Sequence, residues 1–210
     1  MSLFWLFFAI TAVAGYLLGN LNGAILISRL VMKEDVRTKG SGNAGLTNFH
    51  RTYGGLSTFL VLGIDVVKAV AASLLGTWLL GRFGYADLGR MLGGFCAVLG
   101  HMFPIAFQFR GGKGILSAAT LAAMMDWRLF LALLVLFVIV VYFTKYVSLG
   151  SCLGAVLFVP AFFILYPGQW AIIAQAVVLA ALVLYKHRSN IRRLLKGEEN
   201  KLSFHRKQKS

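Results

Sequence analysis

The sequence predicts an all-α integral membrane protein with about seven transmembrane helices. Apolar residues make up 59% of the 210-residue chain, charged residues make up 13%, and the mean hydropathy is +0.77. A soluble domain carries about a quarter charged residues, so this chain has roughly half the usual supply. We therefore expect a single polytopic membrane domain over residues 1–201, followed by a basic, disordered tail over residues 202–210.

Seven apolar runs define the candidate spans. A helix needs about 20 apolar residues to cross the hydrocarbon core, and the fourth run is about half that length, so we expect one short helix. Residues 126–128 and the Pro167-Gly168 pair interrupt the apolar pattern, as turn residues do. Merging the fourth and fifth runs would give six spans instead. The seven runs are residues 3–27, 56–80, 88–107, 114–125, 129–143, 149–165 and 169–185.

The distribution of positive charge predicts the orientation in the membrane. With the N-terminus outside and the C-terminus in the cytoplasm, 17 of the 21 Lys and Arg residues lie on the cytoplasmic side. This excess agrees with the positive-inside bias of membrane proteins. The net charge of +14 could also suggest nucleic acid binding, but the cations lie between and after the apolar runs. We therefore expect no nucleic-acid partner.

Neither cysteine indicates a disulfide or a metal site. Cys96 and Cys152 both lie inside apolar runs, away from any cluster of Cys and His residues in the sequence. Metal-binding motifs place such ligands at short, regular spacings. We expect both cysteines to be small packing residues, and we expect no metal.

The first polar segment, residues 39–51, is named the first motif. Glycines free the backbone to turn its N–H groups toward an anion, and hydroxyl and amide side chains add further donors. An ordinary glycine-rich loop is the alternative, but a plain linker would not concentrate so many short donors with two cations. The donors expected here are Gly40, Ser41, Gly42, Asn43, Gly45, Thr47, Asn48 and Arg51.

The second polar segment, residues 100–114, is named the second motif. It ends in Gly111, Gly112, Lys113 and Gly114, just before an apolar run. The spacing of a nucleotide-binding P-loop is absent, yet glycines and a lysine before a helix favour anion binding by the unpaired N–H groups of that helix. His101 is either part of this site or a helix-end residue satisfied by backbone groups.

The third polar segment, residues 186–201, is named the third motif. In a helix, His187 and Asn190 lie three residues apart and therefore share a face. The alternative function is a basic anchor for anionic lipid. Within the second apolar run, Asp65 and Lys68 are also three residues apart, and we expect a buried pair that locks helix packing.

Together, these segments resemble the acyl-phosphate-dependent glycerol-3-phosphate acyltransferases, the PlsY family. The resemblance covers about residues 15–201. One departure is Asn20-Leu21-Asn22, which stands where a Ser-Ile-Pro-like stretch is usual in the first helix. The resemblance rests on G-S-G-N-x-G-x-T-N-x-x-R ending at Arg51, D-x-x-K ending at Lys68, G-H-x-F-P through G-G-K-G ending at Gly114, V-S-L-G-S over residues 147–151, and H-R-x-N-I-x-R-L with G-x-E ending at Glu199.

The resemblance implies a seven-helix enzyme that moves a fatty acyl group from acyl phosphate to the sn-1 hydroxyl of glycerol 3-phosphate. The products would be lysophosphatidic acid and phosphate, in the first step of phospholipid synthesis. It also implies an active site facing the cytoplasm at the bacterial cell membrane, contact with membrane lipid, no cofactor, and the soluble enzyme that makes acyl phosphate as a partner. The hydroxyl proton could go to His187 or to the donor phosphate.

The residues expected at the site fall into three groups. The expected catalytic residues are Ser41, Arg51, Lys113, His187 and Asn190. The expected substrate-binding or phosphate-binding residues are Gly40, Gly42, Asn43, Gly45, Thr47, Asn48, His101, Gly111, Gly112, Gly114 and Ser148. The expected structural residues are Asp65, Lys68 and Glu199.

A transporter or channel for a phosphorylated solute is the alternative function, because it would also place cationic loops near helix ends. The polar motifs lie on one side of the expected topology, and the sequence shows no inverted repeat of the kind that many transporters carry. Both observations favour the enzyme.

Overall fold

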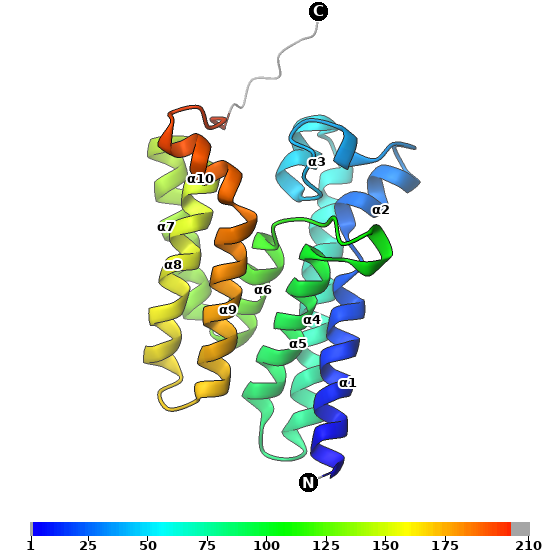
Figure 1. Cartoon of the computed structure of the whole chain (residues 1–210), viewed down its shortest axis with the longest axis vertical. Helices are drawn as coiled ribbons and strands as arrows, with labels where there is room; N and C mark the ends of the chain where they lie inside the picture. The colour runs from blue at the N-terminus through cyan, green and yellow to red at the C-terminus, as the bar shows by residue number, and fades with distance from the viewer. Residues whose placement is uncertain (1, 203–210) are drawn as a thin grey trace, which may run out of the picture. The chain divides into compact units, whose positions relative to one another are not determined.

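The computed structural model describes residues 2–202, and within this range every regular element is helical (Figure 1). This confirms the expected all-α class. The chain divides into two compact units, an N-terminal unit of residues 1–127 and a C-terminal unit of residues 128–210. The single domain expected over residues 1–201 stays a prediction. From residue 203 onward, the expected basic tail lies outside the described residues.

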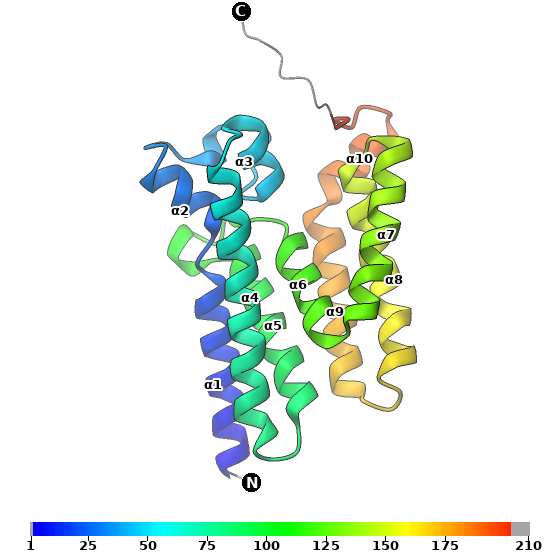
Figure 2. The ribbon, with the colours of Figure 1, turned by 180° about the vertical axis from the view of Figure 1, so that it is seen from behind.

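The N-terminal unit is built around three long helices. α1, α4 and α5 pack against one another in pairs and run side by side (Figures 1 and 2). The short helices α2 and α3 pack against α4, and α6 packs against α4 and α5. The elements are α1 (Ser2–Gly19), α2 (Gly23–Leu30), the 3-10 turn η1 (Val36–Thr38), α3 (Leu46–Thr52), α4 (Ser57–Gly81), α5 (Ala86–Met102), the 3-10 turn η2 (Ile105–Phe107) and α6 (Ile115–Met125).

Small residues allow the three long helices to approach closely. A Cβ atom added to Gly76 of α4 would collide with the Gly89 backbone of α5, and one added to Gly89 would collide with Gly76. Gly19 of α1 lies against the Ala97 backbone of α5 in the same way. In lipid, helices associate through close backbone packing of small residues rather than through hydrophobic burial. These residues therefore determine how tightly the bundle packs.

The first apolar run is not one continuous helix, contrary to the span expected over residues 3–27. α1 ends at Gly19, and α2 begins at Gly23 after a short break. The Asn22 side chain caps α2, because its Oδ1 accepts a hydrogen bond from Ile25 N at 3.1 Å. Asn20 Nδ2 bonds back to Tyr16 O at 2.7 Å. Asn22 thus supplies an acceptor for an N–H group in the first turn of α2, and Asn20 adds a second hydrogen bond to the Tyr16 carbonyl near the end of α1.

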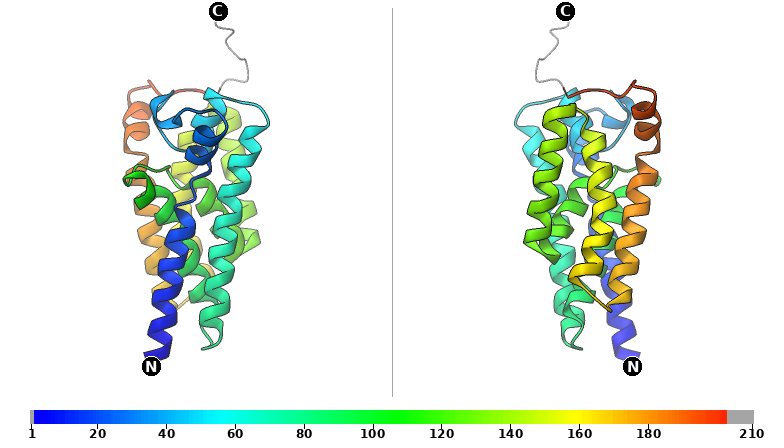
Figure 3. Two further views of the ribbon diagram at one scale, coloured as in Figure 1. Left: turned by 90° about the vertical axis from the view of Figure 1, so that its right-hand side faces the viewer. Right: turned by 90° about the vertical axis from the view of Figure 1, so that its left-hand side faces the viewer.

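The C-terminal unit contains the remaining four helices. α8 packs against α9, and α10 contacts both (Figure 3). α9 and α10 form a pair bent by 59° at His187. α7 lies against α8 where Phe137 and Val141 contact Gly150. The elements are α7 (Trp127–Thr144), α8 (Val147–Leu165), α9 (Trp170–Lys186) and α10 (Arg188–Leu195).

Among the described residues, five helices are long and apolar enough to cross a membrane, or six if the bent pair of α9 and α10 counts as one span. The short apolar helix expected around residues 114–125 is α6, which has 11 residues. The total of seven spans and the orientation of the termini stay predictions.

Candidate anion-binding site

The first motif forms a loop that leads into α3. Gly40 (φ +56°) and Gly42 (φ +70°) adopt the left-handed backbone conformation, which glycine adopts without the steric cost of a side chain. They flank Ser41, whose side chain is exposed. Gly45 is the N-terminal cap of α3. The loop therefore presents Ser41 on a sharply turned backbone.

Asn48 holds this loop in shape from within. Its side chain is buried, and Nδ2 donates to Val36 O and to Lys39 O, each at 3.1 Å. Oδ1 accepts a hydrogen bond from Ser41 N at 2.9 Å. Both amide hydrogens of Asn48 are thus used on the backbone, so Asn48 acts on any ligand through the loop it supports.

The other polar side chains of the first motif are more accessible. Thr47 and Arg51 are exposed on α3, and Asn43 is partly buried. Among residues 2–202, the Arg51 guanidinium has no hydrogen-bond or ion-pair partner. A cation on the helix that follows a glycine-rich loop, with no partner among the described residues, can pair with an anionic ligand.

The second motif folds back onto the last turn of α5. Gly112 N donates to His101 O at 3.1 Å. Added Cβ atoms would collide with the His101 carbonyl at Gly111 and with ring Nε2 at Gly112. Gly114 (φ +77°) caps α6, whose first N–H groups favour an anion. Lys113 therefore lies between close-packed glycine backbone and the start of a helix.

The two motifs contact each other within the N-terminal unit. A Cβ atom added to Gly112 would also collide with Ala44 O of the first motif. The same carbonyl oxygen accepts a hydrogen bond from Asn22 Nδ2 at 3.2 Å. Asn22 Nδ2 also lies 3.5 Å from His101 Nδ1. The sequence predicts both motifs on the cytoplasmic side of the membrane, and the structure connects them through Asn22 and Gly112.

A buried charged network supports this junction. The Lys68 and Asp65 side chains are each 1% exposed and form an ion pair of 2.6 Å. Lys68 Nζ also donates to Leu21 O and lies against His101 Nδ1, each at 2.9 Å. An ammonium has three N–H donors, so each has an acceptor. Gly23 N donates to the same Asp65 oxygen at 3.2 Å. The expected pair is therefore also a brace between α2, α4 and α5.

These contacts assign the ring proton of His101. With Lys68 as an ammonium, which can only donate, Nδ1 of a neutral His101 ring accepts this hydrogen bond and the ring proton lies on Nε2. The Asp65 carboxylate lies farther from Nδ1, at 3.4 Å. Since Nε2 faces Gly112, His101 supports the second motif and does not offer an unprotonated nitrogen on that side.

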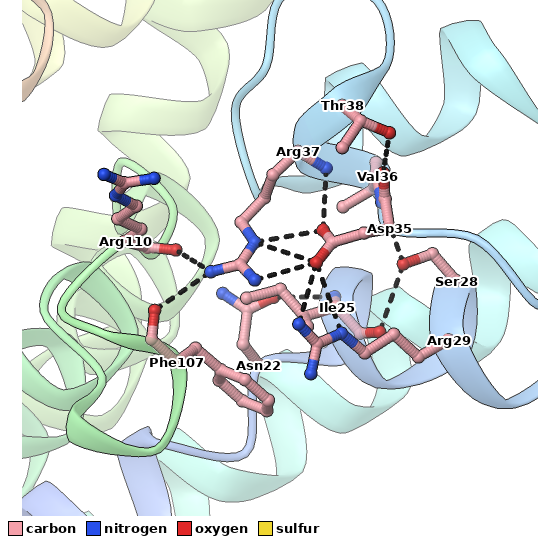
Figure 4. Close-up of polar contacts among 10 residues, drawn as sticks. All are labelled: Asn22, Ile25, Ser28, Arg29, Asp35, Val36, Arg37, Thr38, Phe107 and Arg110. Atoms are coloured by element: carbon pink, nitrogen blue, oxygen red, sulfur yellow. Dashed lines mark hydrogen bonds and ion pairs between the residues drawn. The ribbon is translucent and has the colours of Figure 1, made fainter.

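The sequence did not single out the ion cluster around Asp35, whose partners Arg29 and Arg37 belong to the 17 cations expected on the cytoplasmic side. Asp35 accepts hydrogen bonds from both arginines, and Arg37 also reaches Phe107 O of the second motif at 2.9 Å (Figure 4). The hydrogen bond from Arg37 is the main reason that the pKa of Asp35 lies well below its usual range, although partial burial opposes the shift. The D-x-R spacing just before the glycines was the only signal in the sequence.

In the C-terminal unit, three donors converge on Glu199. Ser148 Oγ and Asn190 Nδ2 donate to Oε1 at 2.9 Å and 2.6 Å, and Arg193 Nε donates to Oε2 at 2.7 Å. Burial alone would raise the pKa of Glu199, but the hydrogen bonds from Asn190, Ser148 and Arg193 outweigh it and lower the pKa. Ser148 and Asn190 thus hold the segment after α10 against the start of α8.

His187 is buried at the bend between α9 and α10. Its Nδ1 lies 2.8 Å from Val183 O. A carbonyl oxygen only accepts, so Nδ1 carries a proton. A neutral His187 therefore has an unprotonated Nε2, the opposite tautomer to His101. Among residues 2–202, no three His, Cys, Asp or Glu side chains form a group that could hold a metal ion.

Comparison with known proteins gives one consistent result. A family model described as glycerol-3-phosphate acyltransferase matches residues 9–197. The glycerol-3-phosphate acyltransferase of Finegoldia magna is 42% identical over 201 residues, which cover 94% of this chain and 98% of that protein. The enzyme of the same description from Thermoanaerobacter pseudethanolicus is 40% identical and covers 92% of this chain and 94% of its own length.

Two solved structures match the fold. Both are crystal structures of PlsY, described as an integral membrane glycerol 3-phosphate acyltransferase. The glycerol 3-phosphate form has a TM-score of 0.83 at 29% identity and covers 93% of this chain and 96% of that chain. The lysophosphatidic acid form has a TM-score of 0.80 at 28% identity, with 93% and 95% covered.

Proposed function

Because the chain belongs to the glycerol-3-phosphate acyltransferase family, we propose that it transfers a fatty acyl group from acyl phosphate to the sn-1 hydroxyl of glycerol 3-phosphate. The observation that carries the proposal is the contact between two glycine-rich, cation-bearing motifs at Gly112 and Ala44. Two phosphorylated substrates need such a surface, which positions them and offsets their charge. The solved PlsY forms with glycerol 3-phosphate and lysophosphatidic acid support this acceptor and this product.

The phosphate groups bind to the N-terminal unit in this proposal. Arg51 and Lys113 supply charge, and Ser41 supplies a hydroxyl on the turned backbone between Gly40 and Gly42. The backbone of the two motifs supplies further donors, and the expected ligand residues there are Asn43, Gly45, Thr47, Gly111, Gly112 and Gly114. Asn48 and His101 act through the loops that they support, since their polar atoms contact protein groups.

The chemical step needs little from the protein beyond positioning. An acyl phosphate is a mixed anhydride, so the sn-1 oxygen attacks the acyl carbon directly. The bond between that carbon and the phosphate oxygen breaks, and phosphate leaves with the electron pair. His187 is the candidate acceptor of the hydroxyl proton, because its neutral form has an unprotonated Nε2. Asn190, Ser148 and Glu199 form the buried cluster that fixes the third motif next to it.

The proposed setting is the bacterial cell membrane, with seven spans, the N-terminus outside, and the motifs facing the cytoplasm. The positive charge of the loops supports this orientation. A cytoplasmic site can receive acyl phosphate from a soluble enzyme that makes it, and can release lysophosphatidic acid into the bilayer.

Turnover by the purified protein tests the proposal. With glycerol 3-phosphate as the acceptor, we expect acyl phosphate to give 1-acyl lysophosphatidic acid, detected by mass spectrometry after separation of the positional isomers. Acyl-CoA and acyl carrier protein should give none. Equal turnover with acyl-CoA would reject the proposed donor.

A matched pair of variants tests the phosphate role of Arg51. A charge-assisted hydrogen bond is worth about 1.5–3 kcal/mol, so Arg51→Ala should lower kcat/KM by about 10- to 150-fold. His50→Ala changes an exposed neighbour on the same helix and should keep near-normal kinetics. Similar values for both variants would remove Arg51 from the site.

A further inference from the structure

Arg37 connects the segment before the first motif to the second motif. Its Nη1 donates to Phe107 O at 2.9 Å and to Arg110 O at 3.3 Å (Figure 4). Its Nε and Nη2 donate to the Asp35 carboxylate, at distances from 2.7 to 3.2 Å. Four of its five N–H donors therefore have acceptors. One edge of the planar guanidinium faces the Asp35 carboxylate and Nη1 faces the two carbonyl oxygens, an arrangement that a lysine ammonium cannot reproduce.

The segment that carries Arg37 is itself held firmly. Asn48 bonds the carbonyl oxygens of Val36 and Lys39, on either side of Arg37. Val36 N donates to Ser28 Oγ of α2 at 3.1 Å. Asp35 Oδ1 accepts from Arg37 N at 3.0 Å and thereby caps the η1 turn. Any movement of Arg37 would therefore move the backbone of the first motif as well.

The segment that Arg37 reaches is under strain. Gln108 (φ +59°) and Phe109 (φ +58°) both adopt the left-handed conformation, which is unfavourable for residues with a side chain. The carbonyl groups that bond Arg37 belong to Phe107 and Arg110, directly before and after this pair. Strained backbone persists only where its surroundings hold it in place. Arg37 supplies part of that restraint immediately before Gly111.

We propose that Arg37, oriented by Asp35, is a positioning residue that sets the spacing of the two phosphate-binding motifs. It contacts backbone rather than substrate. The inference rests on the proposed function of the two motifs in binding phosphorylated substrates. Without Arg37, Asn22 and Gly112 would still connect the motifs, so the protein would fold with a loosened site.

Kinetics on the full-length protein in detergent test the proposal. Arg37→Gln should raise the KM for glycerol 3-phosphate by about 10-fold or more, as expected for losing hydrogen bonds from a charged group, with a smaller effect on kcat. Arg37→Lys should not restore the KM, because an ammonium cannot bridge the carboxylate and the two carbonyls. A loss of folded protein alone would lower the apparent kcat and leave the KM unchanged.

Arg29→Gln is the matched control. Arg29 also donates to Asp35, at 2.9 and 3.2 Å, and its guanidinium lies 5.5 Å from the Phe107 ring, but its hydrogen bonds among the described residues go to Asp35 alone. The KM of the Arg29→Gln variant for glycerol 3-phosphate should stay within about 2-fold of the KM of the unmodified protein. Asp35→Asn should raise the KM in the same direction as Arg37→Gln. The variant with both Asp35→Asn and Arg37→Gln should have a KM no higher than that of Arg37→Gln alone, because both changes remove the same connection between the motifs.

Three results would overturn the proposal: a normal KM in Arg37→Gln, equal effects of Arg37→Gln and Arg29→Gln, or full rescue by Arg37→Lys. If the unmodified protein does not use acyl phosphate, the proposed donor fails, and calorimetric titration with glycerol 3-phosphate decides the role of Arg37. Binding should then be about 10-fold weaker or more in Arg37→Gln and unchanged in Arg29→Gln.

Discussion

Hydrogen bonding gives the two buried histidines different chemistry. His101 accepts from Lys68 at Nδ1 and therefore carries its proton on Nε2, whereas His187 donates from Nδ1 to Val183 O. Both residues stood out in the sequence as histidines in polar motifs near a helix end, His101 directly after Gly100 and His187 three residues before Asn190. Only their partners show that the neutral form of His187 has an unprotonated Nε2, while His101 supports a loop.

The same substitution at both positions should have opposite results. An asparagine oxygen can take the place of His101 Nδ1 as the acceptor for Lys68, so His101→Asn should keep most of its activity. Asparagine cannot replace the basic Nε2 of His187, so His187→Asn should lower kcat by about 100-fold or more. Steady-state kinetics, with melting curves to confirm folding, would check this. Nearly normal kcat in His187→Asn would assign the proton to the donor phosphate.

For single residues, the sequence identified which polar side chains belong to the motifs, but it did not show which groups those side chains contact. Asn48 and Ser148 were expected to bind substrate, yet Asn48 bonds the backbone around Ser41 and Ser148 bonds Glu199. A short polar side chain beside glycine satisfies either a ligand or a backbone group, and residue type alone does not distinguish them. The backbone partners of Arg37 could not be predicted from the sequence either, because they are main-chain carbonyls 70 and 73 positions later in the chain.

At the scale of helices, hydropathy predicted the elements well wherever the chain runs straight. α8 and α9 begin and end within about two residues of the expected runs. The break between α1 and α2 was missed, because two asparagines do not change the mean hydropathy of a long apolar window. The loops around Asp35 and Phe107 could not be derived, since their conformation depends on side-chain bonds between distant segments.

Two glycines of α4 offer a matched test of helix packing. Gly76 lies against the Gly89 backbone, whereas nothing lies within 4 Å of a Cβ atom added to Gly63. Gly76→Ala should therefore lower the melting temperature in detergent, because α4 and α5 must separate. Gly63→Ala should leave it unchanged or raise it, since alanine is up to about 1 kcal/mol better in a helix. Equal shifts would show that close packing at Gly76 contributes little.

At the scale of the whole molecule, the sequence predicts one cytoplasmic face from the 17 of 21 cations that the proposed topology places there. Single cysteines at the exposed positions Thr38, Ile105 and Arg192 should react with an impermeant thiol reagent only from the cytoplasm. Cysteines at Tyr85 and Gln169 should react only from outside. Labelling of intact cells and inverted vesicles would check both. Reaction of Ile105→Cys from outside, with Thr38→Cys reacting from inside, would contradict the proposed topology.

The ion pair between Asp65 and Lys68 also bears on how the protein enters the bilayer during synthesis. A single charge at the bilayer centre costs about 2.5–3.5 kcal/mol on insertion scales. Both charges belong to α4 and lie three residues apart, so the helix carries its own counter-ion before any neighbour arrives. Leu21 O and His101, which precede and follow α4 in the chain, then complete the donor set of Lys68. Whatever the order in which the helices assemble, the Asp65 carboxylate therefore enters lipid with Lys68 beside it.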